Sequence, residues 1–351
     1  MKGVIFEQFG PPEVLRVRND LPKPERKPGQ GRCLVQIAST SVNPIDYKTR
    51  KGEVPRFMVK LPNESSDLFP VVLVLGGDLS GVVVESDEGS KFPPGTRVFG
   101  CTEGFQLYSR EGCYSEYFCA PENQLAVVPA NTTLSDAGAL PLVSLTAWQS
   151  LEAASLSPGN RLLIHAGAGG VGSVAIQIAK ARGLHVTTTC STRNIDFCTK
   201  ELGADVAIDY TTQQFEEVCK NEPFDAVIDL IGGSVEIRSM KVLKKTGTMV
   251  TVLNSGWIKE RGVGMAPLFV LYHLAKNKMF GTLRLGPKYK VILVSPNGEQ
   301  MAEVATLLES RNLKPIIDRK VPLEEVVEAH KYMEQGHARG KVVLIVNPAL
   351  E

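Results

Sequence analysis

The sequence predicts an α/β protein in which a doubly wound parallel sheet is joined to a mainly antiparallel β-barrel. Strand and helix patterns alternate from about residue 128 to residue 285, which is typical of a parallel sheet covered by helices. The flanking parts contain short β-rich runs broken by Gly and Pro, as in a barrel. A chain of 351 residues suits two domains better than one core. We therefore expect a barrel domain over 1–127 and 286–351, and a sheet domain over 128–285.

The barrel is expected from β-rich runs separated by turn residues. In the first third, these runs are 32–38, 79–85, 97–99 and 114–119. Pro93-Pro94-Gly95 is one of the turn clusters between them, and the polar segment 56–69 is expected to form an exposed loop. The last part adds a strand at 290–294, helices at 300–310 and 324–335, and a strand at 341–347.

The middle of the chain repeats a strand–helix unit. Its expected strands are 161–165, 185–189, 206–209, 226–230 and 248–253. Its expected helices are 134–149, 171–182 and 194–202. Because consecutive parallel strands need a crossover connection, this order predicts one parallel sheet.

Charge and composition exclude several classes of protein. The 39 basic residues nearly cancel the 38 acidic ones, so no basic field exists to hold nucleic acid. No apolar run approaches the roughly 20 residues of a membrane span. The seven cysteines are scattered without a C-x-x-C pair, which favours free thiols in a reducing compartment. No signal peptide is recognised, so we expect a cytoplasmic protein, with unconventional organellar targeting left open.

The strongest local motif is a glycine-rich turn between a strand and a helix. Apolar residues 162–164 lead into Gly167-Ala168-Gly169-Gly170-Val171-Gly172, and a helical pattern follows. Glycines allow a sharp turn and a close approach of the backbone to a pyrophosphate, while the helix N-terminus offers free N–H groups to it. The motif predicts a dinucleotide site that includes Ala168, Gly169, Gly170 and Val171; the alternative is a plain turn.

The end of the next strand indicates which dinucleotide is bound. An NAD site places a carboxylate there, about 20 residues past the glycines, to bind the ribose hydroxyls. This sequence has Ser191 and Arg193 instead, which can bind a 2′-phosphate. We therefore predict NADPH, with Tyr210 beside the adenosine. Arg193 as a solvated residue and Tyr210 as a surface aromatic are the alternatives.

Together these motifs resemble the medium-chain dehydrogenase/reductase superfamily, and specifically its quinone oxidoreductase branch. The similarity covers nearly the whole chain and extends to chloroplast-envelope quinone oxidoreductase homologues, alkenal/enone oxidoreductases and the reticulon-interacting oxidoreductase. It rests on segments 41–48, 77–83, 140–147, 202–205 and 336–341, together with the glycine turn. The resemblance implies a Rossmann domain for the cofactor and a GroES-like catalytic domain.

The resemblance also shows where zinc ligands are missing. Zinc-dependent members carry a Cys where this chain has Asn43, and a Gly-His-Glu motif where it has Gly76-Gly77-Asp78. Without a Lewis acid, formation of an alkoxide from an alcohol is difficult. A substrate that accepts hydride at a conjugated carbon remains accessible, so we expect a quinone or enone and no metal.

The candidate catalytic residues are Asn43, Tyr47 and Lys48, because the resemblance places their loop beside the nicotinamide. Lys48 is the only cation of this loop and can stabilise negative charge on the substrate oxygen. Tyr47 can pack on the substrate or relay a proton, whereas Asp46 is expected to orient the loop. The alternative is that Tyr47 and Lys48 only cover the barrel surface.

The resemblance suggests further cofactor residues outside the glycine turn. They are Leu253, Asn254, Tyr289, His337, Ala338 and Arg339. His165, on the strand before the turn, is expected to be packed rather than catalytic.

The leading hypothesis is therefore an NADPH-dependent quinone or enone oxidoreductase. An enoyl-thioester reductase and a non-catalytic NADPH-binding redox sensor are the alternatives. Relatives pair edge strands of two cofactor domains, so a homodimer is expected, with segments 265–274 and 281–285 at its interface.

Overall fold

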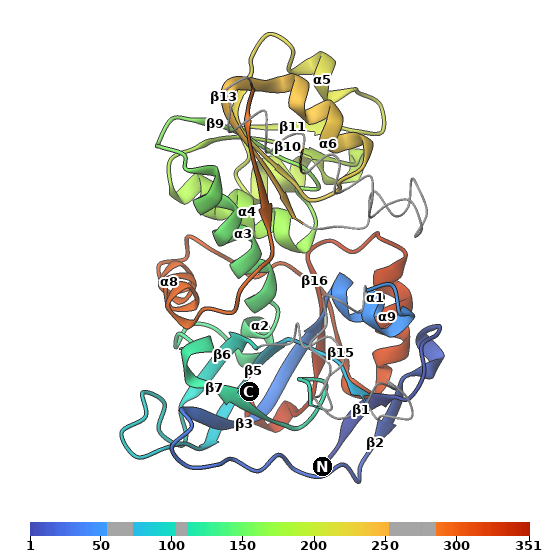
Figure 1. The fold of residues 1–351 in the computed structure, drawn as a ribbon, viewed down its shortest axis with the longest axis vertical. Coiled ribbons are helices and arrows are strands. Elements are labelled where there is room, and N and C mark those ends of the chain that lie inside the picture. Colours follow the sequence, from blue (N-terminus) through green and yellow to red (C-terminus); the bar gives the residue numbers. More distant parts are fainter. Residues whose placement is uncertain (55–72, 103–110, 253–274, 276–285) are drawn as a thin grey trace. The chain divides into compact units, whose positions relative to one another are not determined.

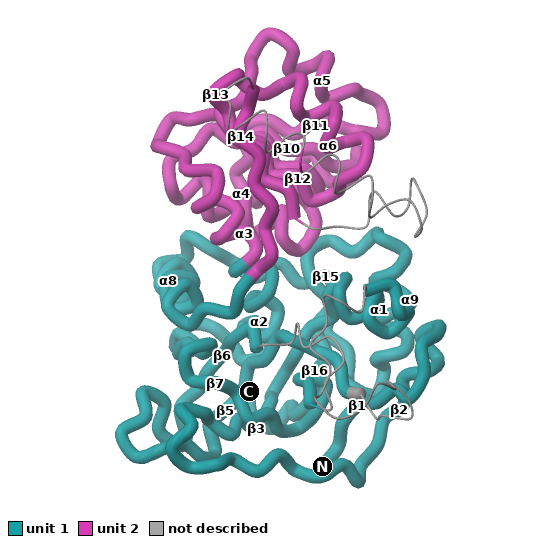
Figure 2. The backbone as a smooth tube through the Cα atoms, viewed as in Figure 1, with its two compact units in different colours: residues 1–145, 295–351 teal, residues 146–294 magenta. Residues whose placement is uncertain are grey.

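The computed structural model describes residues 1–54, 73–102, 111–252, 275 and 286–351 (Figure 1). The chain forms two compact units: unit 1 comprises residues 1–145 and 295–351, and unit 2 comprises 146–294 (Figure 2). These units divide later in the chain than the domain boundaries expected from the sequence. Helix α2 (Leu134–Ala137) contacts strands of unit 1, and strand β14 (Lys288–Ile292) pairs with β13 (Leu243–Val252) in unit 2.

Unit 2 contains one parallel sheet of six strands in the order β11-β10-β9-β12-β13-β14. The four strands not yet defined are β9 (Arg161–Ile164), β10 (His185–Cys190), β11 (Val206–Asp209) and β12 (Phe224–Asp229). The chain runs outward from β9 to β11 and then returns to β12 on the other side of β9. This reversal is the switch point of a doubly wound sheet, and it confirms the predicted fold class.

Two of the expected helices differ in the structure. The helix expected at 134–149 is interrupted, and α3 (Pro141–Ala154) begins at Pro141, whose missing N–H and fixed φ suit the first turn of a helix. The helix expected at 194–202 is replaced by a 3-10 turn (Thr192–Asn194) and a π-helical turn (Phe197–Glu201). By contrast, α4 (Gly170–Ala181) follows the glycine turn as predicted.

Unit 1 is a mainly antiparallel β structure, in agreement with the predicted GroES-like barrel. Its larger sheet has the order β15-β16-β3-β5-β6-β8, with β7 on β3, and a second sheet has the order β2-β1-β4. The larger sheet contains β3 (Arg32–Val42), β5 (Asp78–Glu85), β6 (Arg97–Cys101), β7 (Tyr117–Pro121), β8 (Leu125–Val127), β15 (Ile317–Pro322) and β16 (Lys341–Ile345). The smaller sheet contains β1 (Gly3–Phe6), β2 (Arg16–Arg18) and β4 (Leu73–Val74).

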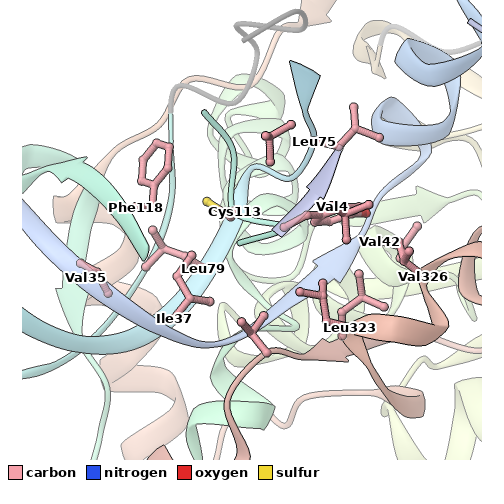
Figure 3. Close-up of a cluster of buried hydrophobic side chains, with 14 of the residues drawn as sticks. Val4, Val35, Ile37, Val42, Leu75, Leu79, Cys113, Phe118, Leu323 and Val326 are labelled. Carbon is pink, nitrogen blue, oxygen red and sulfur yellow. The ribbon is translucent and has the colours of Figure 1, made fainter. Parts of the chain in front are cut away.

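The core of unit 1 gathers apolar side chains from distant parts of the chain (Figure 3). Val4 of β1, Ile37 of β3 and Leu79 of β5 are each at most 1% exposed. Leu323 joins them from the 3-10 turn before α9 (Val326–Glu334), and Val326 joins them from the first position of α9. Full burial of such a side chain contributes about 1.5–3 kcal/mol. This core fixes the sheet on which helix α1 (Pro44–Lys51) begins.

Helix α8 (Gly298–Glu309) completes the described secondary structure of unit 1, together with short turns. Unit 2 further contains the short helices α5 (Phe215–Val218) and α6 (Ser234–Ser239). None of the helices within the described residues is long and apolar enough to cross a membrane.

Candidate active site and cofactor site

The glycine turn of unit 2 connects β9 to α4 with little room for side chains. A Cβ added to Gly172 would lie 2.2 Å from the Ala166 carbonyl oxygen, and one added to Gly167 would lie 2.1 Å from Oγ1 of Thr188. Gly169 meets only the Ala166 oxygen, at 3.3 Å. Gly167 and Gly172 are therefore required by packing, whereas Gly169 leaves its outer side free for a ligand.

The N-terminus of α4 presents backbone donors at this turn. The N–H groups of Gly170, Val171 and Gly172 have no intrahelical acceptor, because they belong to the first turn of the helix. Gly169, Gly170 and Val171 are partly exposed, and Ala168 is buried beneath them. Such a turn is suited to a pyrophosphate group, which the helix dipole also favours.

His165, directly after β9 and before the turn, is buried and has both ring nitrogens in contact with hydroxyl groups of the protein. Its Nδ1 lies 3.0 Å from Oγ1 of Thr189, and its Nε2 lies 2.9 Å from Oγ of Ser239. Ser239 donates its own proton to Val235, so Nε2 of His165 carries the hydrogen. Burial lowers the pKa of His165 to about 3, which keeps the ring neutral. This agrees with the packed side chain expected from the sequence.

The turn after β10 carries the residues expected to bind a 2′-phosphate. Nδ2 of Asn194 donates to Oγ of Ser191 at 3.1 Å, which leaves the Ser191 proton to donate elsewhere. Arg193 is exposed, and Tyr210 at the end of the neighbouring strand is 59% exposed. The carboxylate of Asp209 is adjacent but engaged by three donors from Thr192 and Thr211.

Helix α1 of unit 1 carries the three candidate catalytic residues. Asn43 precedes the helix as its N-cap, and its N–H donates to Oδ2 of Asp46 at 2.7 Å. Asp46 faces the interior, whereas Tyr47 and Lys48 lie on the other side and are half-buried. Burial, assisted by nearby carboxylates, raises the pKa of Tyr47, so its hydroxyl stays protonated at neutral pH.

The side chain of Asn43 is 1% exposed and belongs to a buried polar network. Its Nδ2 donates to Oδ2 of Asp78 at 2.7 Å, and its Oδ1 accepts from Nζ of Lys341 at 2.5 Å. Asp78 also accepts from Oγ of Ser41 at 2.5 Å and from the N–H of Leu142 at 2.7 Å. A catalytic role for Asn43 would therefore act through this network.

Asp46 continues the polar network toward α9. Its Oδ2 accepts a hydrogen bond from the Tyr114 hydroxyl at 3.2 Å, and that hydroxyl lies 3.3 Å from Nε2 of His330. Burial raises the pKa of Asp46 to about 7 and lowers the pKa of His330 to about 3. Tyr114 lies before β7, which begins later than expected from the sequence.

The far end of α1 is tied to α9, which lies beside it (Figure 1). The side chain of Arg50 is fully buried; it donates to the Gly10 carbonyl at 2.7 Å and pairs with Glu334. Lys51 reaches the same carboxylate at 2.7 Å. Contacts at its start, middle and end therefore hold α1 in place.

Sequence reasoning did not single out Asp78, Lys341, Tyr114 and His330 as parts of this network. One signal was available for Lys341, because a lysine opens the strand 341–345, whose other residues are all apolar. Gly340, with φ 78°, precedes it where an added Cβ would lie 2.2 Å from the Ile316 carbonyl oxygen. The partners of Lys341 lie about 300 positions earlier, and no local pattern links them.

The remaining predicted cofactor residues lie apart from the glycine turn in the sequence. Tyr289 of β14 donates its hydroxyl hydrogen to Oε1 of Glu236 at 2.7 Å. His337, Ala338 and Arg339 form the turn between α9 and β16, with the Arg339 N–H 3.3 Å from Asp318. Leu253 and Asn254 lie outside the described residues. The cofactor roles of all six stay predictions.

Comparison with known proteins decides the family. The alcohol dehydrogenase GroES-like domain matches residues 29–130, and a zinc-binding dehydrogenase domain matches 202–344. The mitochondrial NAD(P)H oxidoreductase RTN4IP1 of Mus musculus is 33% identical, over 99% of this chain and 89% of its own length. The chain belongs to the medium-chain dehydrogenase/reductase superfamily.

Two further members of the superfamily are similar to this chain over most of their length. The 2-methylene-furan-3-one reductase of Solanum lycopersicum is 32% identical, over 98% of this chain and 79% of its own. The solved structure of a quinone oxidoreductase from Coxiella burnetii is 36% identical, with a TM-score of 0.82 and 99% of each chain covered. These similarities confirm the predicted family.

Although zinc appears in the description of one matching domain, the described residues of this medium-chain reductase do not fit a catalytic zinc ion. No group of three or more His, Cys, Asp or Glu side chains in the described ranges is placed to hold a metal. Asn43 and Gly77 stand at the expected ligand positions, and the ammonium of Lys341 lies 3.6 Å from Asp78. This local positive charge opposes binding of a second cation.

The raised pKa of Asp46 predicts a pH effect on stability. Its folded-state pKa of about 7 lies above the 3.8 of an aspartate in water, so the folded protein binds this proton more tightly than the unfolded chain. The contribution is fully present below the unfolded pKa and is lost as the pH rises through the folded pKa, about 7. Asp46→Asn, which mimics the protonated acid and does not titrate, should therefore gain stability relative to the wild type as the pH rises from about 5 to about 8.

Urea unfolding of both proteins at the two pH values measures this difference. The same difference in unfolding free energy at both pH values would mean that Asp46 does not titrate in this range.

Proposed function

We propose that this protein uses NADPH to reduce quinones or other α,β-unsaturated carbonyl compounds, without a metal ion. The observation that supports this most directly lies in unit 2. A glycine turn suited to a pyrophosphate precedes α4, and Ser191 with Arg193, rather than a carboxylate, follows β10. The names of the compared relatives include a furanone reductase and a quinone oxidoreductase, which supports the substrate class.

The proposal assigns cofactor binding to residues of the two turns. Gly169, Gly170 and Val171 would bind the pyrophosphate above Ala168, and Ser191 with Arg193 would bind the 2′-phosphate beside Tyr210. When bound, NADPH supplies the hydride. The predicted cofactor roles of Leu253, Asn254, Tyr289, His337, Ala338 and Arg339 belong to the same proposal.

The residues of α1 would act on the substrate oxygen. The ammonium of Lys48 would stabilise the negative charge that develops there, and the hydroxyl of Tyr47 would donate a hydrogen bond or a proton. Asn43, held by Asp78 and Lys341, would keep the start of the helix in position. The protonated Tyr47 is also compatible with reduction of an enoyl thioester, the second candidate function.

We further propose that the protein is a homodimer and is cytoplasmic. Among the described strands, β14 lies at the edge of the sheet of unit 2, where a second copy could pair with it. The interface segments predicted from the sequence lie outside the described residues. Light scattering at micromolar concentration tests the dimer, and a monomeric mass would contradict it. The names of some relatives specify mitochondria or chloroplasts, so fractionation of the native cells tests the compartment.

Oxidation of NADPH by a panel of acceptors tests the function and the role of Lys48. The panel contains 1,4-benzoquinone, 9,10-phenanthrenequinone, an alkenal and an enoyl thioester. Lys48→Ala should slow hydride transfer, since loss of a donor to a developing oxyanion costs about 2.7–4 kcal/mol. The defect should be larger for the alkenal than for benzoquinone, because the more electrophilic quinone needs less stabilisation.

Single-turnover rates for both acceptors measure this effect, and the NADPH dissociation constant serves as the control. Small and equal changes for the two acceptors would make Lys48 a surface residue. Tight NADPH binding without turnover of any acceptor would favour a redox sensor and contradict the proposed function.

Arg193→Glu tests the choice of cofactor. The new carboxylate should repel the 2′-phosphate and weaken NADPH binding by a few kcal/mol, while NADH binding changes little. Fluorescence titration with each cofactor measures the two affinities. If the wild type bound both cofactors equally, Ser191 and Arg193 would not select NADPH.

A further inference from the structure

Two opposite charges are buried beside Asn43. Lys341 is 4% exposed and Asp78 is fully buried. Nζ of Lys341 donates to Oδ1 of Asn43 at 2.5 Å and to the Val42 carbonyl at 3.1 Å, and lies 3.6 Å from Asp78. The removal of two charges from water is costly, and apolar residues of similar volume are often at least as stable.

The pair dictates how the amide of Asn43 is oriented. Oδ1 faces the ammonium of Lys341 and Nδ2 faces the carboxylate of Asp78. A flipped amide would direct its N–H groups at the ammonium and its oxygen at the carboxylate, and both contacts would be repulsive. Only one orientation of the amide is therefore compatible with the two charges.

Three strands meet at this amide. Val42 ends β3 and Asn43 follows it, Asp78 opens β5, and Lys341 opens β16. In the register of the antiparallel pair, Val342 lies opposite Val42 and so places Lys341 beside Asn43. Asn43 is the residue immediately before α1, so the contacts of its side chain lie at the start of that helix.

The position of the first residues of α1 also sets the position of the side chains on its outer face. Asp46 and Arg50 are held on the inner side by Tyr114 and Glu334. Tyr47 and Lys48 lie on the other side of the same short helix. A change at the start of α1 therefore moves both side chains, and misplacement by about 1 Å can cost about 100-fold in rate.

We propose that Lys341 and Asp78 are positioning residues of the active site. Their paired charges hold the amide of Asn43, and through it the start of α1 with Tyr47 and Lys48. This role rests on the proposed reduction, in which those two side chains act on the substrate.

A set of variants separates positioning from simple burial. Lys341→Met keeps the length of the side chain and removes its charge, which leaves Asp78 without its cation. The double variant Lys341→Met with Asp78→Asn removes both charges. Lys320→Met is the matched control, because Lys320 on the neighbouring strand β15 forms an exposed ion pair with Asp136.

Three measurements apply to each variant. They are thermal unfolding, kcat for the alkenal at saturating NADPH, and hydrogen exchange of the segment 43–52 by mass spectrometry. Lys341→Met should lower kcat about 10- to 100-fold and speed exchange of the segment. The double variant should be more thermally stable than Lys341→Met, because no buried charge is left unpaired. Its kcat should nevertheless stay low, and its segment 43–52 should still exchange faster than in the wild type. The control should match the wild type.

If the double variant has the kcat and the exchange rate of the wild type, the proposal is wrong. The defect of Lys341→Met would then come only from the unpaired buried charge of Asp78. Unchanged kcat and exchange in Lys341→Met would overturn it as well. If Lys341→Met does not fold, the double variant decides on its own. If the wild type reduces no acceptor, the proposed function fails, and the exchange of segment 43–52 still shows whether the two charges position α1.

Discussion

The contact among Asn43, Asp78 and Lys341 is the constraint on which unit 1 depends. It joins strands β3, β5 and β16 at the point where the chain leaves the sheet and enters α1. An apolar contact at this position would hold the strands together but would not choose one orientation of the Asn43 amide. The opposite charges of Lys341 and Asp78 on its two sides permit only one orientation of the amide, and the first turn of α1 begins directly after this fixed residue.

In unit 2, the glycine turn before α4 is held in place by neutral polar groups instead of charges. His165 is uncharged and spans the hydroxyls of Thr189 and Ser239 beneath the glycine turn. Thr188 donates to the Ile164 carbonyl and closes the space beside Gly167. The turn is thus held from the protein side, while the partly exposed N–H groups of Gly170 and Val171 remain available for an anion.

The parts of this structure that could be predicted from the sequence depend on local patterns. The alternation of strands and helices predicts the parallel sheet, and the spacing of Gly167, Gly169 and Gly172 predicts the turn before α4. The break before α3 was also readable, because Pro141 favours the first turn of a helix. The turns at 192–201 could not be predicted, because the residues there favour a helix and the packing of Phe197 and Cys198 into the interior overrides this preference.

The buried network of unit 1 could not be predicted in the same way. Asn43, Asp78 and Lys341 are brought together by strand pairing, and Tyr114 and His330, which are also in contact, lie 216 residues apart in the chain. Each residue alone is compatible with an ordinary surface or strand-end position. The resemblance to a known family identified the loop of Asn43 but not what holds its side chain.

Transfer of deuterium from NADPH labelled at C4 of the nicotinamide tests whether the protein delivers hydride to a conjugated carbon without a metal ion. With an alkenal as acceptor, in ordinary water and after dialysis against a chelator, we expect one deuterium atom at the β-carbon of a saturated aldehyde. Mass spectrometry and NMR of the product locate the label. Deuterium at the carbonyl carbon of an alcohol, or activity that disappears with the chelator, would contradict metal-independent hydride transfer to a conjugated carbon.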